Sequence, residues 1–425
     1  MSILAYGVEK HSMENVYDTR YREKLYYILP KRTRIEKKNN LSCTDTKKIA
    51  VFVNLYYFQD LEWYWDYLKK IPENISLFIF SSDEMLLECV KTRFKNRDNF
   101  RIIKKENRGR DVSALLVEGK KYCAGFDYLC FIHDKRWRTE KEKQETQIWI
   151  KSLWDNMLAS PEYISNIIGT FEAHSDIGLL CPPEPIGIEM RAWYNSAWSD
   201  SFEETKRIAE KLRIDADISQ TKPPISLSTV FWCKTDAMKK LLEYPWKYED
   251  FHDEPMPVSG TISHGIERVL AFVAQDAGYK TGMVMVDEYA EYLLSFLQYN
   301  LQEVFSILDD NYGMTSIGKV MLMKMNKEPV IDFFKQHENV FLYGSGVVGR
   351  RVLKQMRVWG CEPKGFVISD KPVVKECEDL PVFSLEEIMG KQNLGIIVTV
   401  GVNYKEDIKK NLTVKGIKEV LFLDA

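Results

Sequence analysis

Short apolar runs alternate with segments of helical spacing along most of the chain, beginning near residue 48. The first run, Ile49–Tyr57, is apolar at nearly every position, which is typical of a strand in a sheet covered on both faces. Strands that alternate with helices predict a mainly parallel α/β sheet. We predict further strands at Leu77–Ser81, Phe100–Lys104, Tyr128–His133, Ile177–Cys181 and Thr229–Cys233, and helices at Leu61–Lys70, Asp83–Phe94, Val112–Lys120 and Gly265–Ala277.

The pattern divides the chain into four parts. Residues 1–47 are rich in Lys and Arg and are expected to form a basic arm, and residues 48–295 form the first α/β domain. Residues 296–336 show no strand pattern and are expected to form a helical connector. Residues 337–425 are expected to form a small Rossmann-like domain with strands at Val340–Tyr343, Gly365–Ser369, Gly395–Val400 and Glu419–Leu423, and a helix at Leu385–Met389.

The basic arm is densest at Lys31–Lys38 (KRTRIEKK). Such a charge run is typical of a solvated arm or helix face. It would also suit contact with anionic lipid or with a phosphate-bearing acceptor, which would place the protein peripherally on the cytoplasmic face of the inner membrane. Both interpretations stay open.

Composition limits the class of partner and the compartment. The formal net charge is −3 at pH 7, so we expect no nucleic-acid partner, because phosphate binding needs a basic surface. The eight cysteines include no CxxC pair, which argues against structural zinc and against a disulfide framework. No apolar run reaches the ~18–20 residues of a membrane span and no signal-peptide pattern is visible, so a cytoplasmic protein is expected.

The segment Asn107–Asp111 (NRGRD) directly follows the predicted strand Phe100–Lys104. Ligands of open α/β sheets bind in loops at the carboxyl ends of parallel strands. Arg108 and Arg110 flank a glycine, so guanidinium groups and bare backbone could approach a diphosphate. Asp111 could hold a sugar hydroxyl or cap the following helix. The alternative is a capped surface turn.

Two further segments carry candidate chemistry. Glu267 lies just inside the predicted helix Gly265–Ala277, where a carboxylate partly removed from water is a candidate general base. The alternative there is a Glu–Arg pair on a helix surface. The strand Tyr128–His133 ends in a polar cluster that could take up phosphate charge or be simply solvated, and its members are His133, Asp134, Lys135 and Arg136.

In combination these residues resemble the rhamnan synthesis F family, glycosyltransferase-like proteins of bacterial cell-wall and capsular polysaccharide assembly. The resemblance covers roughly Lys48–Glu291 and implies a GT-A-type fold with a dTDP- or UDP-sugar donor at the carboxyl edge of the sheet. It implies transfer of rhamnose or another hexose to a hydroxyl of a glycan or lipid-linked glycan acceptor. The family's motifs occur in the family's order as Asn107–Asp111, His133/Lys135, Phe231-Trp232 and His264/Glu267/Arg268.

The residues and the resemblance together assign roles at this site. Glu267 is the leading general base and Asp111 is the second candidate. Phe231 and Trp232 are expected on the acceptor side. The chain departs from the family at Arg136-Trp137 and at Ser228–Val230, so the resemblance does not specify the sugar. The expected donor-binding residues are Asn107, Arg108, Arg110, His133, Asp134, Lys135, His264 and Arg268.

Enzymes with a GT-A fold commonly bind Mg²⁺ or Mn²⁺ through an Asp-x-Asp at the end of the strand that corresponds to Tyr128–His133. Here only Asp134 occupies that place, next to basic residues that could offset the charge of a leaving diphosphate. A literal match, Asp215-Ala216-Asp217, has no predicted strand before it. We therefore expect no metal ligands and no requirement for a divalent metal.

The segment Gly344–Gly349 (GSGVVG) follows a predicted strand and opens a helix, with Asp370 about 20 residues further on. This is the context of a dinucleotide fingerprint, in which glycines let the backbone approach a pyrophosphate. No catalytic Tyr-Lys or His-Asp pair is visible in this part of the sequence. We expect a nucleotide-binding or docking role for Gly344, Gly346, Gly349 and Asp370.

The sequence leaves three classes of function open. The leading class is a glycosyltransferase. The second is a non-catalytic pseudo-glycosyltransferase that scaffolds a polysaccharide-assembly complex, because the Asp-x-Asp is missing. The third is a nucleotide-dependent, sugar-modifying oxidoreductase that would use the C-terminal fingerprint.

Overall fold

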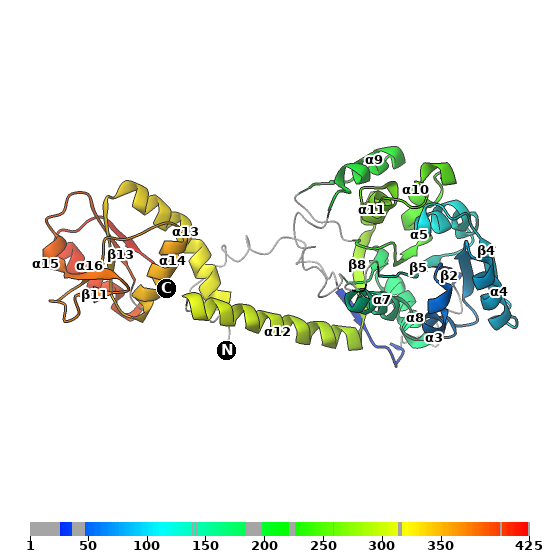
Figure 1. The fold of residues 1–425 in the computed structure, drawn as a ribbon, viewed down its shortest axis with the longest axis horizontal. Coiled ribbons are helices and arrows are strands. Elements are labelled where there is room, and N and C mark those ends of the chain that lie inside the picture. The colour runs from blue at the N-terminus through cyan, green and yellow to red at the C-terminus, as the bar shows by residue number, and fades with distance from the viewer. Residues whose placement is uncertain are drawn as a thin grey trace. The chain divides into compact units, whose positions relative to one another are not determined.

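The computed structural model describes residues 26–35, 47–137, 140, 143–183, 198–220, 226–257, 259–312, 317–399 and 402–423. The chain divides into two compact units, residues 1–294 and residues 295–425 (Figure 1). Most of the predicted basic arm, at residues 1–25 and 36–46, lies outside the described residues.

An eight-stranded sheet forms the centre of the first unit, with the strand order β1-β8-β6-β7-β5-β2-β3-β4. Neighbouring strands are parallel except around β7, which runs antiparallel to both β5 and β6. The predicted mainly parallel α/β sheet is therefore confirmed. The strands are β1 (Tyr26–Leu29), β2 (Ile49–Asn54), β3 (Ser76–Ser81), β4 (Phe100–Lys104), β5 (Tyr128–His133), β6 (Ile177–Cys181), β7 (Phe231–Lys234) and β8 (Lys280–Val286).

Helices cover both faces of this sheet and enclose two hydrophobic cores (Figure 1). Strand β2 is buried at all of its positions, because it lies between the two cores. One core packs under α3 (Leu61–Leu68), α4 (Glu84–Arg93), α7 (Lys143–Leu158) and α8 (Pro161–Ala173). The other packs under α5 (Arg110–Ser113), the π-helical η4 (Ala114–Gly119), α6 (Lys120–Cys123), α9 (Phe202–Leu212), α10 (Lys239–Leu242) and α11 (Ile262–Asp276).

Strand β1 was not predicted, because only two of its four residues, Tyr27 and Leu29, are buried and the pattern is too short to recognise. It pairs in parallel with β8. Directly after it, Lys31 donates from Nζ to the Glu288 carboxylate at 2.6 Å and from its backbone N–H to Asp287 at 3.1 Å. The start of the basic stretch is therefore attached to the first unit through Lys31, whereas residues 32–35 are exposed, and both interpretations of the stretch stay open.

The second unit contains a smaller sheet in the order β11-β12-β10-β9-β13-β14, parallel except for the antiparallel pair β11–β12. Among the described helices, none is both long enough and apolar enough to cross a membrane. Helices α12 (Asp287–Tyr312) and α13 (Ile317–Gln336) precede this sheet. Its elements are β9 (Asn339–Tyr343), α14 (Val347–Val358), β10 (Phe366–Ile368), β11 (Glu376–Cys377), β12 (Leu380–Ser384), α15 (Leu385–Ile388), β13 (Leu394–Val398), α16 (Val402–Val414) and β14 (Val420–Phe422).

Candidate functional site

The candidate site lies at the carboxyl edge of the large sheet. Strands β2 and β5 are parallel neighbours, and their last residues, Asn54 and His133, are paired in register. Strand β4 ends at the same edge with Lys104. The loops that follow β2, β4 and β5 therefore leave the sheet at one edge, which is where open α/β sheets bind their ligands.

Two consecutive left-handed residues shape the loop after β4. Gly109 has a φ of 69° and Arg110 a φ of 46°. A Cβ atom at position 109 would lie 2.6 Å from Cγ of Phe251 and 2.9 Å from Cβ of Ser113. The Ser113 hydroxyl donates to the carbonyl of Arg108 at 2.5 Å and fixes the turn. Both the backbone angle and the available space therefore require glycine at position 109.

Both arginines of this loop contact the segment 251–254. Arg108 donates from Nε to the carbonyl of Phe251 at 2.8 Å, and its guanidinium pairs with Asp253 at 3.0 Å. Arg110 lies 3.4 Å from a carboxylate oxygen of Glu254. The neighbouring Asn107 is exposed. The loop thus presents two cations at the edge of the sheet, each with a carboxylate partner.

His133 connects β5 to the arginine loop. Its Nδ1 lies 2.7 Å from the carbonyl oxygen of Asp134, so we assign the Nδ1 proton to this hydrogen bond. Nε2 then faces Asp111, whose carboxylate oxygen is 3.7 Å away. Two predicted site residues from different strand ends are therefore brought together.

Asp134 was expected to bind the donor, but its side chain points into the protein and is 6% exposed. One carboxylate oxygen accepts the backbone N–H groups of Tyr56 at 2.6 Å and of Tyr57 at 2.7 Å. Burial raises the pKa of the Asp134 carboxyl to about 6, although the two hydrogen bonds act to lower it. This corrects the expectation, because Asp134 holds the loop after β2 against the end of β5.

Lys135 contacts helix α7 in this structure. Its ammonium lies 3.4 Å from the centroid of the Trp149 ring, which is a cation–π arrangement. Its backbone N–H donates to the Tyr64 hydroxyl at 3.2 Å. Arg136 is the exposed cation of this segment, 5.8 Å from the Tyr57 ring. To bind a diphosphate, Lys135 would have to leave the indole ring.

The first turn of α11 brings His264 close to the arginine loop. Burial lowers the pKa of His264. The charges of Arg268 and Arg110 lower this pKa as well, whereas those of Glu267 and Asp111 raise it. The charged groups of the loop after β4 therefore lie near enough to α11 to interact with it. The arginine loop and His133 meet at Asp111, and His264 at the start of α11 lies within range of the charges of that loop.

Glu267 forms an ion pair with the adjacent Arg268, and the two side chains are 18% and 13% exposed. The Ser226 hydroxyl donates to the backbone carbonyl of Glu267 at 2.7 Å. Thr261 caps the helix, with its hydroxyl 2.7 Å from Nδ1 of His264. The carboxylate of the leading candidate base is thus partly buried, with a fixed positive charge beside it.

Phe231 and Trp232 were expected on the acceptor side, and the structure places both in the interior instead. Each is fully buried, on opposite faces of β7 and hence in different cores. The Trp232 indole donates to the carbonyl of Met157 at 3.0 Å. Neither ring can touch an acceptor in this conformation, so their role is to pack the sheet.

Two features of the site were missed from the sequence. Lys105, the residue after β4, is 6% exposed and donates to the carbonyl of Glu106 at 2.6 Å, and burial lowers its pKa to about 8. Tyr56, in the loop after β2, has a ring that is 47% exposed. The sequence signal for Tyr56 was the apolar run that continues beyond the end of the strand. Lys105 has no comparable signal, because a second lysine precedes it.

The family model for rhamnan synthesis protein F matches residues 6–279, more than half of the chain. The chain belongs to this family. Two curated relatives, both named uncharacterized protein WxcX, come from strains B100 and ATCC 33913 of Xanthomonas campestris pv. campestris. Each is 19% identical over 236 residues, 55% of this chain and 32% of the relative. The chain therefore spans about a third of the length of the curated relatives that it matches.

The glycine turn of the second unit lies outside the part that matches the rhamnan synthesis protein F family. Gly344 has a φ of 105°, and a Cβ at Gly349 would lie 1.8 Å from the carbonyl oxygen of Gly344. Gly346 caps helix α14, and Asp370 is exposed beyond the end of β10. Close packing of strand against helix explains Gly349, and nucleotide binding here stays a prediction.

Carboxylates in the described ranges form no cluster of three or more potential metal ligands with His or Cys. At Asp215 the backbone N–H donates to the carboxylate of Asp276 at 2.8 Å. The literal match, Asp215-Ala216-Asp217, lies between α9 and β7 and does not follow directly after a strand, as the sequence predicted.

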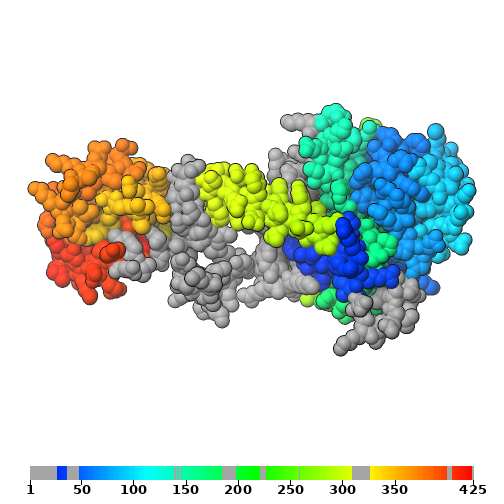
Figure 2. Space-filling view, turned by 90° about the horizontal axis from the view of Figure 1, so that it is seen from below, coloured from blue at the N-terminus to red at the C-terminus, as the bar shows by residue number. Residues whose placement is uncertain are grey.

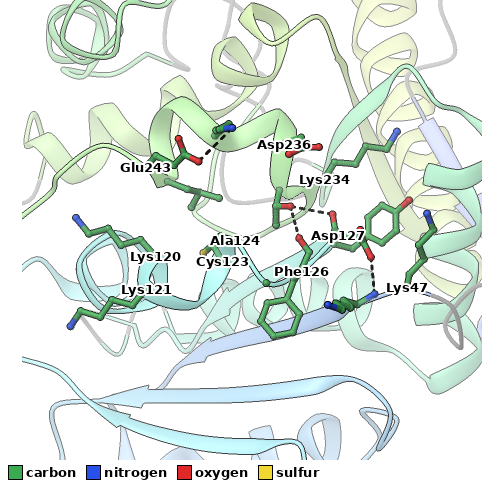
Figure 3. Close-up of a pocket in the computed structure, with 16 residues that line it drawn as sticks. Lys47, Lys120, Lys121, Cys123, Ala124, Phe126, Asp127, Lys234, Asp236 and Glu243 are labelled. Atoms are coloured by element: carbon green, nitrogen blue, oxygen red, sulfur yellow. Dashed lines mark hydrogen bonds and ion pairs between the residues drawn. The ribbon is translucent and has the colours of Figure 1, made fainter.

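A hollow of about 890 Å³ lies at the opposite edge of the same sheet, where β2 and β5 begin (Figure 3). Six lysines line it, but several of them already have partners. Lys120 donates to the carbonyls of Tyr244 and Trp246, and Lys234 donates to the carbonyl of Ser175. We therefore assign no ligand to this hollow.

Proposed function

We propose that this member of the rhamnan synthesis protein F family is a glycosyltransferase of cell-surface polysaccharide synthesis that works on the cytoplasmic side of the membrane. The observation that supports the proposal most is that the arginine loop and His133 meet at Asp111 at the carboxyl edge of the sheet, with His264 of α11 within range of the charges of that loop. This is the edge at which α/β sheets bind ligands. The antiparallel strand inside a mainly parallel sheet fits the GT-A fold that the family resemblance implies.

The donor is a dTDP- or UDP-sugar whose diphosphate lies against Arg108 and Arg110. The Asp253 side chain that pairs with Arg108 is 82% exposed, and exposed ion pairs contribute only ~0–1 kcal/mol. Phosphate oxygens can therefore replace this carboxylate at little cost, and the planar guanidinium binds two of them at once. The same fixed charges would stabilise the negative charge that develops on the departing diphosphate.

The acceptor is a hydroxyl of a glycan or a lipid-linked glycan, which attacks the anomeric carbon of rhamnose or another hexose. A general base takes the proton of this hydroxyl as the bond to the leaving diphosphate breaks. Glu267 is the first candidate for the base and Asp111 the second. Glu267 forms an ion pair with Arg268, and the Asp111 carboxylate lies 3.7 Å from Nε2 of His133.

Divalent metal is not required in this proposal. The carboxylate of Asp134 is engaged by two backbone N–H groups and faces the interior. Basic side chains at the edge include Arg108, Arg110 and Arg136, which can offset a diphosphate as fixed cations.

A thermal-shift panel of UDP-, dTDP- and GDP-sugars with the full chain tests the proposal. A ligand that binds only the folded protein raises its apparent stability. We expect one nucleotide class to raise the melting temperature of the wild type and to have little effect on Arg108→Ala. Lys104→Ala is the matched control, because Lys104 is exposed next to the loop and pairs with Glu84 outside the site. No shift with any nucleotide sugar would contradict the proposal.

A non-catalytic scaffold is the second candidate, and one observation favours it. Both loop arginines already have carboxylate partners, so the loop is stable without a ligand. Binding of a nucleotide sugar without any hydrolysis or transfer would support the scaffold. The oxidoreductase alternative requires NAD(H) bound to the second unit, which an absorbance spectrum of the purified chain would reveal.

A further inference from the structure

Helix α12 exposes a row of large apolar side chains. Leu294, Leu297, Leu301 and Val304 have exposed fractions of 69%, 41%, 44% and 49%. Their spacing of three, four and three residues is that of the a and d positions of a coiled coil, and Leu308 continues the row one step further. Soluble chains seldom leave such a continuous apolar stripe in water.

The first two turns of α12 pack partly on the first unit, although Tyr292 is 47% exposed there. Tyr289 is 9% exposed and belongs to a core of the first unit, and Ala290 and Leu293 pack against that core. The stripe thus starts where the helix leaves its own core. Figure 2 shows part of the surface of α12, in yellow-green, open to solvent.

The charges of α12 indicate which partner fits the stripe. Between Leu294 and Leu308 the only charged residue is Glu303, which heptad spacing places on the other side of the helix. Two copies can therefore bring their stripes together without like-charge repulsion. A membrane surface fits poorly, because residues 287–312 contain six acidic residues and no Lys or Arg.

We propose that the stripe Leu294–Leu308 is a self-association surface, through which α12 of one chain packs against α12 of a second copy. The seam is apolar over about four helical turns, a length at which coiled-coil contacts with knobs in holes become effective. This inference does not depend on the glycosyltransferase proposal, since the stripe takes no part in the candidate site.

The test is the molar mass of the full chain by light scattering and sedimentation over a micromolar concentration series. We expect the wild type to be a dimer or a larger assembly, and Leu297→Asp/Leu301→Asp to be a monomer whose first unit still unfolds cooperatively by tryptophan fluorescence. Ser295→Asp/Ser306→Asp is the matched control, because it adds the same charge at exposed positions on the other side of α12 and should leave the assembly intact.

A milder pair, Leu297→Ala/Leu301→Ala, removes apolar area without adding charge. It should raise the dissociation constant at least ~10-fold, which corresponds to ~1.4 kcal/mol. A monomeric wild type, or an aspartate pair that still assembles, would overturn the proposal. So would a monomer that sediments with phosphatidylglycerol vesicles, because the stripe would then be a lipid-binding face.

Discussion

Replacing Asp134 by asparagine is expected to stabilise the protein at neutral pH. The carboxyl group is 6% exposed, and burial raises its pKa from 3.8 to about 6. An acid with a higher pKa in the folded than in the unfolded chain holds its proton longer when folded. Its contribution to stability is therefore most favourable below pH ~4 and declines until pH ~6. Above pH ~6 the buried carboxylate lowers the free energy of unfolding by ~3 kcal/mol, because its pKa is raised by about two units and each unit corresponds to ~1.36 kcal/mol.

Asparagine keeps an oxygen that can accept the N–H groups of Tyr56 and Tyr57, and it removes the buried charge. Its amide N–H groups need partners of their own, so we expect a net gain of ~1–2 kcal/mol at pH 8. Alanine leaves both backbone N–H groups unpaired at ~1–3 kcal/mol each, so Asp134→Ala should be less stable than Asp134→Asn by ~2–6 kcal/mol.

Thermal unfolding of the full chain between pH 4 and pH 8 measures these differences. Tryptophan fluorescence reports mainly on the first unit, which contains nine of the ten tryptophans. The advantage of Asp134→Asn over the wild type should grow from pH 4 to pH 6 and then stay constant. Glu88→Gln, at a carboxylate that is 66% exposed, is the control and should show no such trend. An asparagine variant less stable than the wild type at pH 8, with a difference independent of pH, would refute the reasoning.

Three further predictions concern the site. Glu267→Gln should lower turnover ~10²–10⁴-fold in transfer kinetics, while titration shows that donor binding is kept. If the variant loses donor binding and folding to the same extent as turnover, the role of Glu267 is structural, in pairing with Arg268. Transfer should persist in EDTA, and complete loss that Mn²⁺ restores would contradict the fixed-cation argument. Gly109→Ala should destabilise the first unit by at least ~1 kcal/mol and weaken donor binding, because a Cβ meets Phe251 at 2.6 Å in left-handed backbone. Gly125→Ala, whose nearest atom would be 3.5 Å away, is its control in thermal unfolding.

The sequence predicted six of the eight strands of the large sheet, most of them as continuous apolar runs, but it missed β1 and also β8, although five of the seven residues of β8 are buried. The bounds of β5 and β6 agree with the prediction at both ends. The antiparallel direction of β7 was not predictable, since an apolar run contains no information on strand direction. Strand β1 was missed because it exposes every second residue and has only four of them.

The motifs predicted that Asp111 and His133 come together at one edge of the sheet, but they did not predict the direction of individual side chains. His133 and Asp134 are adjacent in sequence, yet the first faces Asp111 and the second faces the interior. Phe231 and Trp232 were predicted on the acceptor side, and the structure places them in the cores. The sequence could not distinguish the two roles, because an aromatic residue that stacks on a ligand and one that packs a sheet look alike in sequence. Such distinctions depend on the chain segments that cover each strand end.

The account rests on the arginine loop as the site of the donor diphosphate, and titration calorimetry of UDP and dTDP into the full chain tests this most directly. We predict that Arg110→Ala weakens binding of the preferred nucleotide at least ~10-fold, equivalent to ~1.4 kcal/mol. Arg110→Lys should also bind more weakly than the wild type, because it keeps the charge and loses the planar fork, whereas Lys104→Ala should bind as the wild type does. If both Arg108→Ala and Arg110→Ala bind the nucleotide as tightly as the wild type, the loop is only a helix cap and the account is contradicted.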